Sequence, residues 1–503
     1  MRSVHGILKG ETLERRVQGG SASLPSPQKG NQMLKKLQKL FAPRDLTVGN
    51  TVSGIVMFAI PLLIGNLAQQ LYNTVDAIVV GRYVGDAALG AVGLTMPIVN
   101  LILVLFMGIS TGATIVVSQY FGAKDRKELS KAVGTTIMLT VISGIIMAII
   151  GALLSRPLLV LLDTPEEMLD MAAEYLIIVM IGLVGSGLYN ILSGVMRGMG
   201  DSVSPLLYLL VACGLNVVLD ILFVAGFGMT TDGVAWATII AQAISAFLCV
   251  RRLYRMKDVI DLDRSTLRVS KHIMHRVVRL GVPSGMTQMI FSLSSILVQS
   301  LTNSLGGAIV TANTMVMRID GFAMMPNFTF GIAATTFAGQ NIGARKLDRV
   351  FKGAKETLMI GVGTSVVMVA GILLLGKNLL YIFTQTPEVI ALGESMLRTL
   401  AVGYIAFAAS QVLQGIMRGA GETVIPMWIS IICTVIIRMP LAYIWAYLSK
   451  SPAYPNGDPM CLYGSLLISW LFGCGMSVYF YFRSKWRRRL LVDLTPETTE
   501  GSK

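Results

Sequence analysis

Long apolar runs alternate with short polar segments along almost the whole chain. Twelve of the runs are long enough to cross a bilayer as helices, because about 20 apolar residues span its hydrocarbon core. They lie near 55–80, 89–117, 132–155, 171–193, 205–227, 233–250, 278–301, 308–335, 354–376, 391–414, 425–448 and 461–482. The pattern predicts an all-α polytopic membrane protein with twelve transmembrane helices.

The second half of the chain repeats the first. The stretch from Leu192 to Pro205 matches the stretch from Leu413 to Pro426 at an offset of 221, with eight of fourteen positions identical. The same offset places the Gly-Ala pair that ends at Ala123 on the pair that ends at Ala344, in each case three residues after a Gln. Six helices per repeat is an even number, so both repeats start on the same side of the membrane. We therefore expect two parallel six-helix repeats, an N-lobe and a C-lobe, around a central cavity.

The repeats set the expected domain boundaries. Residues 51–250 would form the N-lobe and residues 277–482 the C-lobe, with a charged cytoplasmic linker at 251–276. The polar segments 1–50 and 483–503 are expected to be cytoplasmic tails, the first of them disordered.

Composition and charge agree with a membrane location. Hydrophobic residues make up 53% of the chain and charged residues 14%, and the mean hydropathy is +0.67. Of the 42 Lys and Arg residues, 35 lie in the termini and even-numbered loops on one side. This asymmetry predicts a cell-membrane protein with both termini cytoplasmic. The net charge of +14 then comes from basic residues in cytoplasmic loops and tails, which contact an anionic inner leaflet. We expect no nucleic-acid partner, and a monomer.

Two acids of the first half fall within predicted spans, where ionisable groups are costly and usually functional. Asp76 and Asp220 are each estimated to lie about 6–10 Å inside the outer end of their helix. Asn216 is one turn below Asp220, Tyr72 is one turn below Asp76, and Thr238 lies at similar depth.

Carboxylate, amide and hydroxyl oxygens at one depth suit a proton relay or a hard cation. We therefore expect H⁺ or Na⁺ as the coupling ion and no other cofactor, with a Na⁺ site at Asp76, Asn216, Asp220 and Thr238. The alternative is that an acid near a helix end only reaches the lipid headgroups, and this applies most to Asp76.

These residues resemble a known family. Pro61, the segment from Tyr72 to Asp76, the Asn-x-x-x-Asp spacing that ends at Asp220 and the segment Gly233 to Thr238 are similar to the multidrug and toxic compound extrusion (MATE) family. The resemblance covers essentially all twelve spans and favours the prokaryotic DinF/MepA-like branch. It implies a fold of two six-helix lobes. It also implies that Tyr72, Asp76, Asn216, Asp220 and Thr238 form a cation or proton site in the N-lobe, and that Pro61 kinks the first helix.

The second half carries charges of its own near the middle of the membrane. Arg318 and Asp320 lie in its second span and Arg438 in its fifth. We weigh two interpretations of this C-lobe cluster, an Arg–Asp pair that locks the lobe and a role in gating or substrate contact.

The function predicted from the sequence is secondary active antiport, not catalysis. The chain would export organic, often cationic, small molecules in exchange for the ion by alternating access. The alternative is a flippase for lipid-linked saccharides, which needs cationic groups such as Arg318 and Arg438 to hold phosphates. The turn Gly198-Met-Gly-Asp201 matches the short Gly-x-Gly-Asp motif of intramembrane aspartyl proteases, but its copy in the repeat has Glu422.

Overall fold

The computed structural model describes residues 43–79, 86–162, 164–452 and 454–483. Predictions that fall on residues 1–42 and 484–503 lie outside this part of the chain. From Pro43 onward the chain forms one compact unit, and the described residues contain helices and no strand. The elements are α2 (Thr51–Val79), α3 (Asp86–Gly122), α4 (Arg126–Leu161), α5 (Glu166–Gly198), α6 (Val203–Asp220), η2 (Ile221–Gly226), α7 (Thr231–Arg255), α8 (Lys271–Ser304), α9 (Gly307–Gly343), α10 (Leu347–Tyr381), α11 (Pro387–Gly419), α12 (Val424–Ile431), η3 (Ile432–Arg438), α13 (Met439–Leu448) and α14 (Met460–Arg483).

The twelve predicted spans are present among the described residues, each at its predicted place. The fifth span of each half is interrupted by a π-helix, η2 in the first half and η3 in the second. Eleven spans are apolar enough to cross a membrane by length and composition alone. The twelfth is α9, whose 37 residues include Arg318, Asp320 and several buried amides that lower its mean hydropathy.

The connection between the halves is shorter than predicted. Because α7 continues to Arg255 and α8 begins at Lys271, the non-helical segment is 256–270 instead of 251–276. This segment packs on the start of α4, where Asp261 forms an ion pair with Arg126 and its backbone N–H donates a hydrogen bond to Ser130 Oγ (2.9 Å).

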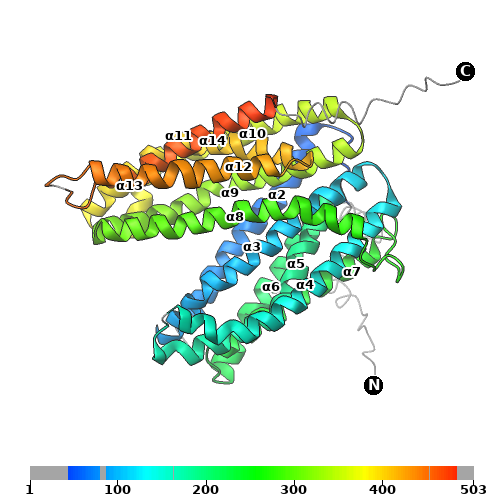
Figure 1. Cartoon of the computed structure of the whole chain (residues 1–503), viewed down its shortest axis with the longest axis horizontal. Helices are drawn as coiled ribbons and strands as arrows, with labels where there is room; N and C mark the ends of the chain where they lie inside the picture. The colour runs from blue at the N-terminus through cyan, green and yellow to red at the C-terminus, as the bar shows by residue number, and fades with distance from the viewer. Residues whose placement is uncertain (1–42, 80–85, 163, 453, 484–503) are drawn as a thin grey trace, which may run out of the picture. The chain divides into compact units, whose positions relative to one another are not determined.

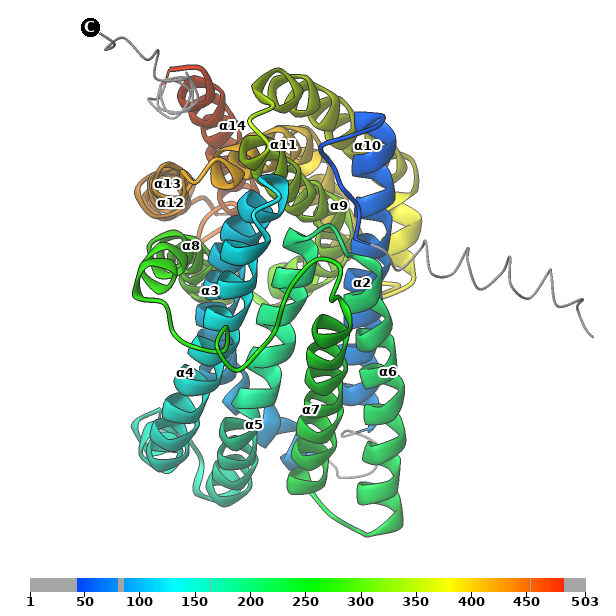
Figure 2. The same cartoon turned by 90° about the vertical axis from the view of Figure 1, so that its right-hand side faces the viewer.

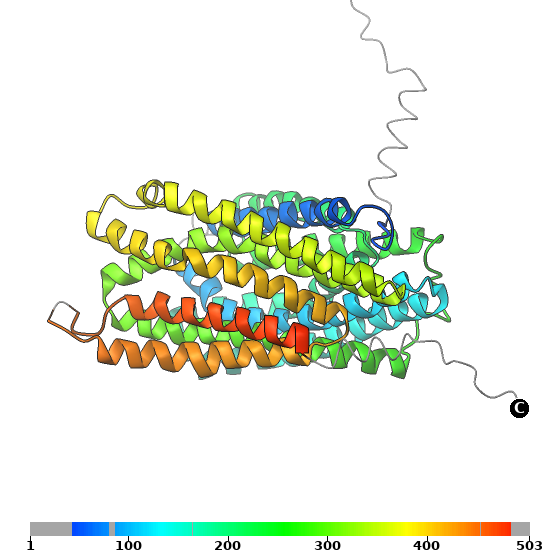
Figure 3. The same cartoon turned by 90° about the horizontal axis from the view of Figure 1, so that it is seen from above.

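The first helix of each half packs partly into the other half. The start of α8, through Ile273, Val277 and Leu280, belongs to an apolar core made otherwise of first-half residues and the segment that connects the halves. The start of α2, through Ile55 and Phe58, belongs to a core made otherwise of second-half residues and the segment before α2. Figure 3 shows the blue α2 alongside α10, which it contacts. The two repeats are therefore joined by an exchange of their first helices.

This exchange occurs at one end of the helices. We call it the basic end, because it carries the connections 123–125, 199–202, 256–270, 344–346 and 420–423 beside most of the described Lys and Arg residues. Toward the opposite end, called the outer end, each half has a separate core of its own residues. In Figure 1 the helices of the two halves lie close together toward the right, at the basic end, and diverge toward the left.

The Gly-x-Gly-Asp turn has a structural role at the basic end. The Asp201 carboxylate accepts hydrogen bonds from the backbone N–H (2.9 Å) and hydroxyl (2.7 Å) of Ser204 in the first turn of α6. It also accepts from Nε (3.3 Å) and Nη2 (3.2 Å) of Arg252 on α7. A buried acid with these contacts caps α6 and ties it to α7.

We expect Asp201→Ala to lower the thermal unfolding midpoint of the purified protein. The variant loses the cap and an ion-pair partner, worth about 1–3 kcal/mol. Asp201→Asn keeps an acceptor for the Ser204 N–H and loses only the charge, so it should fall between Asp201→Ala and the wild type. Equal midpoints for the wild type and Asp201→Ala would contradict this role.

Candidate functional site

Three of the predicted first-half residues meet inside the lobe. Asn216 and Asp220 lie one turn apart on α6, and only 1% and 0% of their surfaces are exposed. Thr238 lies on α7, which packs against α6. A buried carboxyl and a buried amide are thereby held beside a half-buried hydroxyl.

The Asn216 amide connects the other two residues. In one orientation its Nδ2 donates to Asp220 Oδ2 (2.9 Å) and its Oδ1 accepts from the backbone N–H of Thr238 (3.3 Å). The reverse orientation would put Oδ1 against the carboxylate and Nδ2 against the backbone N–H of Thr238, so both contacts would be mismatched. An ionised carboxylate only accepts hydrogen bonds, so it selects the first orientation.

A change of helix type follows Asp220 directly. The α-helical hydrogen bonds of α6 end at Asp220 and the π-helix η2 begins at Ile221. The fifth span of the second half also contains a π-helix, η3, which ends at Arg438. π-Segments inside helices frequently accompany functional sites. In each half, the π-segment adjoins a charged residue within the membrane.

The first helix supplies the remaining predicted residues. Tyr72 lies on α2, which packs against α6. Asp76 is in the same helix, but its side chain lies outside the part of the structure that is described. Pro61 lies inside α2, which continues as a helix from Thr51 to Val79.

The structure separates the three charges of the second half. Asp320 on α9 and Arg438 at the end of η3 both line a cavity of about 260 Å³ inside the second-half bundle. Arg318 is exposed and is not part of this lining. Among the described residues, none of the three charged groups forms an ion pair within 4.0 Å. The predicted cluster is thus reduced to two groups that share a cavity.

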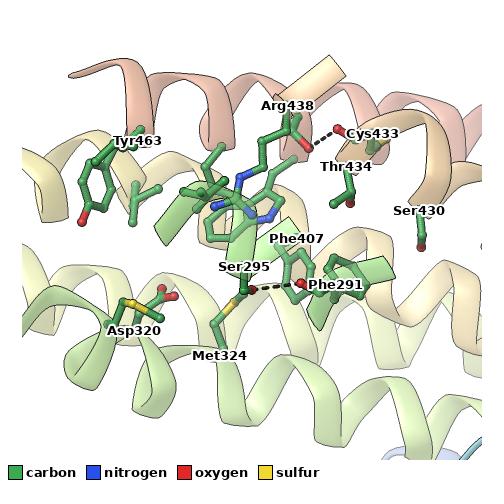
Figure 4. Close-up of a pocket in the computed structure, with 18 of the residues that line it drawn as sticks. Phe291, Ser295, Asp320, Met324, Phe407, Ser430, Cys433, Thr434, Arg438 and Tyr463 are labelled. Atoms are coloured by element: carbon green, nitrogen blue, oxygen red, sulfur yellow. Dashed lines mark hydrogen bonds between the residues drawn. The ribbon is translucent and has the colours of Figure 1, made fainter. Parts of the chain in front are cut away.

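Sequence reasoning missed the aromatic side chains around this cavity. Figure 4 shows Asp320, Arg438, Phe407 and Tyr463 at the pocket, which also includes Trp470. The Phe407 and Trp470 rings are 5.3 Å apart, and the Tyr463 hydroxyl hydrogen-bonds to Asn313 Oδ1. These residues come from α9, α11 and α14, so only the folded arrangement brings them together.

Sequence reasoning also missed a pair of contacts that joins the halves at the basic end. Gln119 Nε2 on α3 donates to the carbonyl of Gly419 on α11 (2.9 Å). Gln340 Nε2 on α9 donates to the carbonyl of Gly198 on α5 (2.9 Å). The offset of 221 relates the two glutamines and also the two glycines, so each repeat binds the other through the same pair of positions. We call these two bonds the reciprocal glutamine contact.

The oxygens of both glutamine amides are used as well. Gln340 Oε1 accepts from the backbone N–H of Leu46 (2.9 Å), and Gln119 Oε1 accepts from Nη2 of Arg276. Arg276 is near the start of α8, which packs on α3 as Figure 2 shows from the basic end. The signal in the sequence was the duplicated Gln that precedes each Gly-Ala pair.

We expect Gln119→Leu and Gln340→Leu to favour separation of the halves at the basic end. Each removes the bond to the glycine carbonyl and the bond accepted by the amide oxygen, and each unsatisfied buried group costs about 1–3 kcal/mol. The separation can be measured by double electron–electron resonance between spin labels at exposed Lys127 and Lys352, in a variant without native cysteines. Gln70→Leu, at an exposed position of α2, is the matched control. An unchanged distance distribution in both Gln119→Leu and Gln340→Leu would contradict the prediction.

The comparisons with known proteins agree with this architecture. A sequence profile described as MatE matches residues 61–222 and again residues 283–444, once in each half. "Probable multidrug resistance protein YoeA" of Bacillus subtilis is 28% identical over 452 residues, which cover 87% of this chain and 95% of that protein. "Probable multidrug resistance protein YpnP" of the same organism is 30% identical over 403 residues, covering 80% and 90%.

A solved structure has the same fold. It is titled an outward-facing conformation of a multidrug resistance MATE family transporter of the MOP superfamily. It has a TM-score of 0.80 and 24% sequence identity, and the match covers 89% of this chain and 97% of that one. Both matches of the profile, the twelve spans and this likeness agree: the chain is a multi-pass membrane protein that belongs to the MatE family of transporters.

Proposed function

We propose that the chain is a secondary active antiporter of the cell membrane that exports organic, often cationic, compounds in exchange for H⁺ or Na⁺. Family membership and the multidrug-resistance names of the relatives support export of small molecules. The distribution of Lys and Arg supports cytoplasmic termini and a cytoplasmic basic end.

The buried group of Asp220, Asn216 and Thr238 is the observation that carries the ion-coupling proposal. A carboxyl that is fully buried within the membrane is costly when ionised, and here an Asn N–H group compensates it. A proton on Asp220 removes the charge that this N–H group compensates. One proton then changes the electrostatic balance of a site that joins α6 to α7.

The same oxygens fit a small hard cation. The Asp220 carboxylate, the Asn216 Oδ1 and the Thr238 hydroxyl are the ligand types that Na⁺ prefers. A cation at Asp220 would replace the Asn216 N–H group as the partner of the carboxylate. H⁺ and Na⁺ would therefore act on the same acid.

The contacts at the basic end support alternating access. The halves are joined there by the reciprocal glutamine contact and the exchanged first helices, and their outer cores are separate. We propose that this is the outward-open state, and that the inward-open state requires these contacts to break. The ion drives the exchange only if it binds one state more tightly than the other.

The alternative, a flippase for lipid-linked saccharides, is not favoured. Its support was a set of cationic groups, but Arg318 lies apart from Arg438, and Arg438 shares its cavity with an acid. The curated relatives reported above are named multidrug resistance proteins.

The test is export from liposomes that contain the purified wild-type protein. Efflux of the fluorescent cation ethidium is followed under an imposed pH gradient, an imposed Na⁺ gradient, or neither. We expect efflux under one of the gradients and only leakage without one. Efflux that is equally fast with no gradient would overturn ion coupling.

A further inference from the structure

The cavity in the second half contains two opposite charges that the protein itself leaves incompletely paired. Asp320 enters from α9 and Arg438 from the end of η3 (Figure 4). Asp320 Oδ1 and Arg438 Nε are buried and have no hydrogen-bond partner in the described part of the chain. Tyr404 lies beside the acid. Buried charges without full pairing are costly, and a bound group that completes them would lower that cost.

The wall next to these charges is aromatic. Phe407 lies 5.5 Å from Phe328 and 5.3 Å from Trp470, measured between ring centroids. All three line the cavity, and Phe328 is partly exposed. A ligand with a flat apolar ring system would be held by this wall.

The cavity is also accessible from one side. Its lining includes Ser295 of α8 and Met317 of α9, and both of these residues are exposed. Because α8 packs mainly on α3 and α12, it leaves the α9 side of the cavity less covered. A small molecule can therefore enter without unfolding the bundle.

We propose that this cavity binds aromatic zwitterions, with the amine of the ligand on Asp320 and its acidic group on Arg438. A simple cation would satisfy Asp320 but meet the like charge of Arg438. A simple anion would satisfy Arg438 but meet the like charge of Asp320. Only a molecule with both charges completes both groups. Repulsion disfavours singly charged molecules, and attraction at both groups favours zwitterions. This substrate class deepens the proposed export function and rests on it.

The size of the cavity limits the ligand. A volume of about 260 Å³ lies at the lower end of small-molecule sites and suits two fused rings with a short charged side chain. Three indole compounds share the ring and a two-carbon chain and differ in the charged groups on that chain. Tryptophan carries an ammonium and a carboxylate, tryptamine only the ammonium, and 3-indolepropionate only the carboxylate.

The test is equilibrium dialysis of the purified full chain in detergent with each radiolabelled compound. We expect wild type to bind tryptophan at least tenfold more tightly than either singly charged analogue. Asp320→Asn should weaken tryptophan and tryptamine but not 3-indolepropionate. Arg438→Gln should weaken tryptophan and 3-indolepropionate but not tryptamine. Arg398→Gln, in an exposed ion pair with Glu394, is the control that should change nothing.

Three outcomes overturn the proposal. They are equal or undetectable binding of the three compounds to wild type, equal weakening of all three by either variant, or a preference for one singly charged analogue. The order of the three affinities is measured on wild type alone, so the test remains valid even when a variant fails to fold. Equilibrium binding needs no ion gradient. If transport fails but wild type still binds the three compounds in the expected order, only the ion-coupling proposal is overturned.

Discussion

Asp220→Asn is expected to reduce ion-driven export strongly. Asn has nearly the shape of Asp and can still hydrogen-bond to Asn216, so the fold should survive. It cannot bind a proton or hold a cation by charge, so the ion no longer distinguishes two states. We expect ethidium efflux under the driving gradient to fall by about 5- to 150-fold, the usual range of a coupling free energy.

The dependence of ethidium binding on the ion should also disappear in Asp220→Asn. If H⁺ is the coupling ion, proton and substrate compete, so ethidium affinity in wild type rises as pH rises. If Na⁺ is the ion, affinity falls as Na⁺ is added. Asp220→Asn should show neither trend, because the competing site is gone. Fluorescence titration of ethidium with the purified proteins measures both.

The matched control is an acid of the same half outside the site. Asp170 on α5 has 80% of its side chain exposed and pairs only with exposed Arg156 among the described residues. Asp170→Asn should leave efflux and its ion dependence unchanged. If Asp220→Asn exports as fast as Asp170→Asn under the driving gradient, the first-half site is not the coupling site.

Gly343→Ala is expected to prevent the basic end from closing. A Cβ at Gly343 would lie 1.9 Å from the carbonyl oxygen of Gln119, where ordinary contacts begin at 3.4 Å. The obstacle is backbone, so it cannot rotate away. Gly122 makes the equivalent approach to the carbonyl of Gln340, also at 1.9 Å. Either substitution must move α3 and α9 apart and with them the reciprocal glutamine contact.

Two readouts check this prediction. The distance between spin labels at positions 127 and 352 should lengthen, and gradient-driven efflux should fall by at least about tenfold, since a 1.4 kcal/mol bias against one state already has that effect. Gly371→Ala in α10 is the control, because a Cβ there meets nothing within 4 Å. Unchanged distances in Gly343→Ala would show that this interface does not close tightly in the protein.

The sequence predicted the spans and the duplication because both depend on local or repeated patterns. Runs of apolar residues determine membrane helices almost alone, and the span predicted at 308–335 is present as α9 in spite of Arg318 and Asp320. The i,i+4 spacing of Asn216 and Asp220 predicted their shared face, and the structure places Thr238 beside them.

Packing between helices far apart in the chain could not be predicted in the same way. The aromatic wall joins Phe407 of α11 to Trp470 of α14, and no local pattern specifies that neighbour. The π-segments η2 and η3 consist of apolar residues apart from Thr434 and Arg438, and no sequence pattern marks them as π-helical. The separation of Arg318 from Asp320 could have been predicted from the sequence, since residues two apart on a helix do not face each other.

The central claim is that substrate leaves as the ion enters through the first-half acid site. The most direct measurement records ethidium efflux and ion entry together in the same sealed liposomes, with a pH-sensitive or Na⁺-sensitive dye outside the substrate's spectrum. We predict ion entry that starts with efflux, in a fixed ratio to it, and that is absent in Asp220→Asn. Efflux without ion entry, at a rate that survives collapse of both gradients, would contradict the account.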